Sequence, residues 1–175
     1  YYFSEAFYAL ANAEYYGVTG ERENLERARW AYDLYWDLSH GAPDPTGLGP
    51  KTIPETRTGR AFGPPMIILN VTNVLLRVDP ERKAPYQERA QQSVDEIFKY
   101  HVHPELKCVL ENVAEDGTAR LYYTEGRTVN PGHDIEGSWF LLEHARNTGN
   151  QELVKQAAQI FDWAIEAGWD QEYGG

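Results

Sequence analysis

Six segments of this chain show helical periodicity, and they alternate in the way they distribute apolar side chains. The period of 3.6 residues predicts helices at about residues 1–17, 22–38, 64–78, 85–101, 131–148 and 151–167. The second, fourth and sixth segments carry one apolar stripe among charged residues, whereas the first, third and fifth are apolar nearly all round. We therefore expect the striped helices to face water and the other three to form an inner layer.

The connections between the predicted helices alternate as well. Links from inner to outer helices are short, whereas the links that lead back to an inner helix, at about residues 39–63 and 102–130, are long. Long loops in compact domains are usually functional, so we expect the functional site at the rim where the inner helices begin. The second long loop predicts a β-hairpin with strands at residues 107–113 and 118–123 and a turn at 115–117.

Successive helix hairpins of this kind predict an all-α fold in which two rings of helices form an (α/α) double-ring toroid. Six helices are too few to close a wide toroid, so the chain is expected to be part of an (α/α)6 barrel with the short β-hairpin in a rim loop. The expected organisation is a single partial domain over residues 1–175 that is truncated at both ends.

Composition and charge exclude several classes of protein. An apolar content of 42% indicates a globular chain, and a net charge of -11 opposes binding to nucleic acid or to anionic lipid. No apolar run approaches the roughly 18 residues that a membrane span needs. The single cysteine, Cys108, excludes an internal disulfide and a thiolate zinc site, and it fits a reducing compartment. We therefore expect a cytoplasmic protein without nucleic-acid or membrane partners.

One short motif indicates acid–base chemistry at the start of the fifth predicted helix. Asn130 is a good N-cap and Pro131 suits the first helical position, which places His133 in the first turn, where the helix dipole disfavours imidazolium. A neutral imidazole can accept a proton, and Glu136, at i+3, can hold one ring nitrogen. Two alternatives remain open: His133 as a structural core histidine, and Glu136 as an ordinary acid of the first helical turn.

Four segments together resemble the N-acylglucosamine 2-epimerase family, and they occur in order along the chain: residues 2–8, 109–117, 130–142 and 168–175. The resemblance implies an (α/α)6 barrel longer than this chain that interconverts N-acetylglucosamine and N-acetylmannosamine. It also implies that His133 is one of a pair of catalytic histidines whose partner lies in a later inner helix, beyond residue 175. The segment 1–175 alone is therefore expected to be inactive.

The implied reaction assigns roles to further residues. One base takes the C2 proton of the open-chain sugar, charge spreads to O1 as an enolate, and a proton returns to the opposite face, so no metal or redox cofactor is expected. The enolate needs a donor or cation, and Arg60 and Arg127 are candidates by position. Glu111 in the long loop and Glu5 near the rim are further candidates for binding a monosaccharide substrate, although solvated positions are equally open for both.

Other functions remain open at this point. Related activities are a cellobiose or mannose-type epimerase and an aldose–ketose isomerase. An inverting glycoside hydrolase on an (α/α)6 scaffold would use two carboxylates about 6.5–9.5 Å apart and would not need a histidine at the centre of the site. A non-catalytic carbohydrate-binding domain is compatible with the same fold. A homodimer is also possible, because a severed barrel would expose apolar faces.

Overall fold

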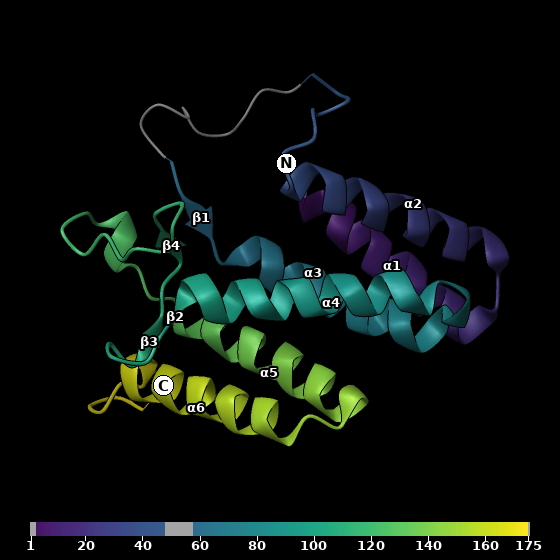
Figure 1. The fold of residues 1–175 in the computed structure, drawn as a ribbon. Coiled ribbons are helices and arrows are strands. Elements are labelled where there is room, and N and C mark those ends of the chain that lie inside the picture. Colours follow the sequence, from purple (N-terminus) through teal and green to yellow (C-terminus); the bar gives the residue numbers. More distant parts are fainter. Residues whose placement is uncertain (1–2, 48–57, 175) are drawn as a thin grey trace. The chain divides into compact units, whose positions relative to one another are not determined.

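A computed structural model describes residues 3–47 and 58–174 of the chain (Figure 1). It confirms the six predicted helices, although residues 1 and 2 of the first lie outside the described part. The α-helices are α1 (Phe3–Thr19), α2 (Arg22–Ser39), α3 (Gly63–Val78), α4 (Lys83–Glu96), α5 (Pro131–Thr148) and α6 (Gln151–Gly168). The strands are β1 (Arg60–Ala61), β2 (Val102–His103), β3 (Cys108–Val109) and β4 (Asn112–Val113). Short helical turns occupy Pro80–Arg82, Ile97–His101 and Glu125–Arg127.

The chain packs as two compact units. The first unit comprises residues 1–57 and 67–91, so it holds α1, α2 and most of α3 and α4. The second comprises residues 58–66 and 92–175 and holds the four strands, α5 and α6. Organisation as one partial barrel domain stays a prediction. No helix in the described part of the chain is long and apolar enough to cross a membrane.

Helix α1 packs on α2 in the first unit through a face of small residues. Ala6, Ala9 and Ala13 are fully buried, which allows close approach of the two helices. The opposite face of α1 carries Phe7 and Tyr8, which are 55% and 45% exposed. The prediction that this helix is covered all round, as an inner helix would be, is therefore wrong for the described structure. Helix α3, by contrast, is buried along most of its length, as predicted.

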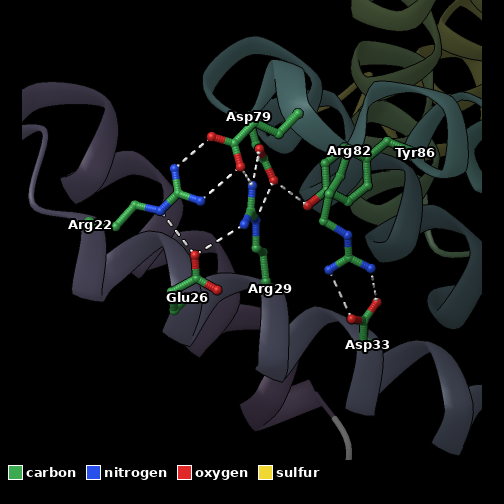
Figure 2. Close-up of polar contacts among 8 residues, drawn as sticks. Arg22, Glu26, Arg29, Asp33, Asp79, Arg82 and Tyr86 are labelled. Atoms are coloured by element: carbon green, nitrogen blue, oxygen red, sulfur yellow. Dashed lines mark hydrogen bonds and ion pairs between the residues drawn. The ribbon is translucent and has the colours of Figure 1, made fainter.

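A buried carboxylate organises the polar contacts of the first unit (Figure 2). The Asp79 side chain is fully buried and accepts hydrogen bonds from the guanidinium of Arg29 at 2.7 and 2.5 Å and from the Tyr86 hydroxyl at 2.8 Å. Burial opposes ionisation, but these hydrogen bonds hold the pKa of Asp79 below its usual value. Arg82 pairs with Asp33 of α2 at 2.9 Å in the same way. Both ion pairs fasten α2 to the segment that follows α3.

The second unit contains two small antiparallel sheets, and they differ from the predicted hairpin. Strand β4 pairs with β1, with Val113 opposite Arg60, and β3 pairs with β2, with Val109 opposite Val102. The predicted turn is present, since the Gly117 N–H donates to the Ala114 carbonyl at 2.9 Å. The predicted pairing of residues 107–113 with 118–123 is wrong. Strand partners are set by tertiary packing as well as by the local alternation that suggested the hairpin.

Removing the buried arginine should test how much the first unit depends on Asp79. Arg29→Met leaves the Asp79 carboxylate buried without its main partner, so we expect a loss of about 3 kcal/mol in the free energy of unfolding. Arg27→Met is the matched control, because Arg27 lies on the same helix and pairs with Glu23 in an exposed ion pair; its cost should stay below about 0.5 kcal/mol. Urea unfolding followed by circular dichroism measures both. Equal losses in the two variants would contradict this role of Asp79.

Candidate active site

Helix α5 begins where the sequence predicts, and its first turn carries the candidate base. Asn130 has an extended backbone, and its side chain accepts from the backbone N–H of His133 at 3.4 Å. Pro131 occupies the first turn, where no N–H is needed, and the Asp134 N–H makes the first helical bond to the Asn130 carbonyl at 2.9 Å. The predicted cap and the position of His133 are confirmed.

Glu111 is held in place by its own backbone. Its N–H donates to the Thr128 carbonyl at 3.0 Å, and its carbonyl accepts from the Phe62 N–H at 2.9 Å. The preceding residue, Leu110, donates its N–H to the carbonyl of His101 at 2.9 Å. Three separate segments of the second unit therefore converge on residues 110 and 111, which leaves the direction of the Glu111 side chain well defined.

The Glu111 carboxylate binds the imidazole of His133. Its Oε1 atom lies 2.5 Å from His133 Nδ1. An ionised carboxylate can only accept, so Nδ1 carries the proton and Nε2 keeps its lone pair. Nε2 makes no hydrogen bond to the described residues, and the His133 side chain is 42% exposed whereas that of Glu111 is 14% exposed. His133 is thus an oriented base that solvent can reach, and Glu111 is its largely buried counter-charge.

Glu136 does not take the role that the sequence suggested for it. Its side chain is exposed, and the ring nitrogen that it was expected to hold is bound by Glu111 instead. The spacing i, i+3 places two residues on the same helix face, but it cannot exclude a stronger partner from another segment. In the described structure Glu111 holds the imidazole, and a catalytic role for Glu136 stays a prediction.

Arg60 is occupied by structural contacts. Its Nε donates to the Glu115 carbonyl at 2.8 Å, its Nη1 pairs with Glu96 at 3.1 Å, and its guanidinium lies 4.2 Å from the centre of the Tyr100 ring. These contacts hold β1 against the end of α4 and the turn after β4. A guanidinium engaged on three sides is a poor choice for an enolate donor, which disfavours the role predicted for Arg60.

The remaining two candidates lie in different units. Arg127 is exposed at the end of the turn Glu125–Arg127, directly before Thr128, whose carbonyl accepts from Glu111. It therefore stays a candidate for substrate binding near the Glu111–His133 pair. Glu5 lies in the first unit and is half-buried, with one carboxylate oxygen that has no hydrogen-bond partner in the described structure. Its role in substrate binding stays a prediction.

Asp134 was not singled out from the sequence, and the structure places it beside the candidate base. Its side chain is 1% exposed. Burial and the nearby charge of Glu111 raise the pKa of Asp134 to about 7, although His133 and a hydrogen bond with the Val109 backbone favour the charged form. One signal in the sequence was available, because Asp134 begins the buried stripe of α5. The other members of that stripe are Gly137, Ser138, Leu141 and Ala145.

Close packing against Gly137 joins α5 to the residue that precedes α3. A Cβ atom built on Gly137 would lie 2.7 Å from Cζ of Phe62, so only glycine fits without a shift. The Phe62 ring also lies close to the His101 ring, with ring centres 5.6 Å apart. His101 is fully buried and donates from Nδ1 to the Leu110 carbonyl, and burial lowers its pKa to about 4, so it stays neutral. The starts of α3 and α5 are thus held together, and a rim shared by all three inner helices stays a prediction.

Comparisons with known proteins identify the family of the chain. The family model described as N-acylglucosamine 2-epimerase (GlcNAc 2-epimerase) matches residues 1–175. The N-acylglucosamine 2-epimerase of Rattus norvegicus is 35% identical over 175 residues, which cover 99% of this chain and 41% of that protein. The chain belongs to the N-acylglucosamine 2-epimerase family, and it spans less than half the length of the relatives it matches.

Solved structures show the same fold. The cellobiose 2-epimerase of Bacillus thermoamylovorans matches with a TM-score of 0.75 at 18% identity, over 96% of this chain and 45% of that one. A family 76 glycoside hydrolase from a bovine Bacteroides thetaiotaomicron strain matches with a TM-score of 0.68 at 15% identity, over 92% of this chain and 34% of that one. Both are (α/α)6 barrels, so the predicted all-α fold class, part of such a barrel, is confirmed.

The close contact at Gly137 gives a test of the scaffold around the site. Gly137→Ala should lower the free energy of unfolding by about 1–2 kcal/mol, because overlap with Phe62 outweighs the gain in helix propensity. Adding Phe62→Leu should recover part of that loss. Gly132→Ala is the control, since a Cβ there would meet only Asn130 Oδ1, at 3.3 Å, and should change stability little. Urea unfolding measures all three, and a Gly137→Ala variant as stable as the native protein would contradict the packing argument.

Proposed function

We propose that this chain supplies one of the two catalytic bases of a sugar 2-epimerase, with His133 as the base. The observation that carries the proposal is the Glu111–His133 pair, in which a carboxylate holds Nδ1 and leaves Nε2 able to accept a proton. Membership of the N-acylglucosamine 2-epimerase family supports it. An imidazole suits the task because its ordinary pKa lies near neutral pH, where a general base is most effective.

The reaction proceeds through an enolate. The C2–H bond of the open-chain sugar breaks, its proton passes to Nε2 of His133, and its electron pair forms the C1–C2 double bond while charge moves to O1. Glu111 stabilises the imidazolium that results. A proton then returns to C2 from the opposite face, given by a second base outside this chain. Arg127, exposed beside Thr128, is the proposed donor to the enolate oxygen in preference to Arg60.

No cofactor enters these steps, because each is a proton transfer. In the described part of the chain, no group of three or more histidine, cysteine, aspartate or glutamate side chains could hold a metal ion. The single cysteine is free, which suits a reducing compartment, so we propose a cytoplasmic enzyme. A homodimer stays a possibility that the proposal does not need.

We propose N-acetylglucosamine and N-acetylmannosamine as the substrate pair. The sequence is 35% identical to the N-acylglucosamine 2-epimerase of Rattus norvegicus, against 24% to the cellobiose 2-epimerase of Dictyoglomus turgidum. By the family resemblance, members of the cellobiose branch usually carry a histidine in the third helix. The corresponding residues 66–72 of this chain contain no histidine. The glycoside hydrolase alternative shares the fold, but it gives no role to an oriented histidine at the centre of the site.

Replacing the base should abolish the first chemical step. In the full-length protein, His133→Asn should remove exchange of the C2 proton of N-acetylmannosamine with deuterated water, with a loss of about a hundredfold or more. Nuclear magnetic resonance of the C2 proton follows the exchange directly. His103→Asn is the matched control and should exchange at the native rate, because that histidine pairs with Glu105 and makes no hydrogen bond to Glu111 or His133 in the described structure. Native exchange in the His133 variant would disprove the assignment.

Replacing the carboxylate should weaken the base without removing it. A glutamine at position 111 can donate to Nδ1, which moves the imidazole proton to Nε2, and it cannot stabilise imidazolium. Glu111→Gln should therefore lower the C2 exchange rate at least about tenfold. Glu105→Gln alters the other Glu–His pair of the second unit, with His103, and should leave the rate unchanged. Equal rates in the two variants would show that Glu111 has no part in the reaction.

A further inference from the structure

Asp134 is a buried acid that the reaction above does not use. Its side chain is 1% exposed, and the charged or titratable groups around it are His133 on the same helix, Glu111 on the loop after β3, and Cys108 on β3. A hydrogen bond with the Val109 backbone is its one polar contact, and its Oδ1 atom is buried with no hydrogen-bond partner in the described structure. A purely structural carboxylate would be expected to satisfy both oxygens.

The charge of this carboxyl group changes close to neutral pH. A buried carboxylate with one unsatisfied oxygen is costly, and the adjacent charge of Glu111 adds repulsion, so burial and Glu111 raise the pKa of Asp134 to about 7. The group is neutral at about pH 5.5 and ionised at about pH 8.5. His133 is among the charges that act on the Asp134 carboxyl group, so the two groups interact electrostatically.

We propose that Asp134 is a positioning residue that controls the strength of His133 as a base through its own charge. When His133 takes the C2 proton it becomes imidazolium, and an ionised Asp134 stabilises that cation together with Glu111, whereas a neutral Asp134 leaves Glu111 to act alone. The buried side chain has no access to a sugar, so it acts through His133. The effect on rate rests on the proposed function.

The first experiment compares pH profiles of the full-length protein. Asp134→Asn keeps the shape and removes the charge, so its kcat for C2 exchange should equal that of the native protein at about pH 5.5 and fall about three- to tenfold below it at about pH 8.5. KM should not change. The control is Glu152→Gln, which alters a first-turn acid of α6, a helix with the same asparagine cap; its kcat should match the native value at both pH values. A kcat ratio between native protein and Asp134→Asn that does not vary with pH would overturn the proposal.

The second experiment follows the titration directly by nuclear magnetic resonance, without sugar, in the native protein and in Asp134→Asn. In native protein labelled with carbon-13 and nitrogen-15, the ring signals of His133 should show an inflection at the pH where the Asp134 carboxyl carbon titrates, near pH 7. The Asp134→Asn protein, where it folds, should lose that inflection. If the native protein shows this inflection but no C2 exchange in the first experiment, the epimerase function is refuted. The electrostatic link between Asp134 and His133 would still be supported. If the His133 ring signals do not change at the pH where Asp134 titrates, the proposed electrostatic link between the two groups is wrong.

Discussion

The backbone hydrogen bonds of Glu111 are the interaction on which the candidate active site depends. A buried loop must satisfy its N–H and C=O groups, and here Glu111 does so with Thr128 on one side and Phe62 on the other. Phe62 directly precedes α3, and Thr128 lies two residues before Asn130, the cap of α5. Satisfying the backbone therefore also aims the Glu111 side chain at His133. Loss of these backbone hydrogen bonds would move the Glu111 carboxylate, whereas His133 would keep its place on α5.

Packing and chemistry are coupled along one face of α5. Gly137 lets Phe62 approach the helix, and the same face carries Asp134, one turn earlier, into a buried position. That burial is what makes a carboxyl group beside His133 titrate near neutral pH. The electrostatics of the site thus depend on the same buried face of α5 that Gly137 and Phe62 pack together.

The first unit depends on a different kind of interaction. Asp79 is buried and ionised because Arg29 and Tyr86 satisfy it, whereas Asp134 is buried with one oxygen unsatisfied. Burial raises the pKa of both carboxyl groups, but the hydrogen bonds and charge of Arg29 and the hydrogen bond of Tyr86 bring that of Asp79 below its usual value. The satisfied group serves stability. The unsatisfied one lies next to the candidate base, where a charge that changes near neutral pH has a chemical use.

The sequence by itself determined the helices, the asparagine cap that starts α5 and the first-turn position of His133, because each depends on residues within a turn or two of one another. It did not predict the strand partners or the exposed face of α1. Only the tertiary structure decided that Glu111, and not Glu136, holds the imidazole, and that Asp134 is buried beside it. The reason is physical: Glu111 and His133 lie 22 residues apart, and they meet only because the loop backbone is hydrogen-bonded to two other segments of the fold.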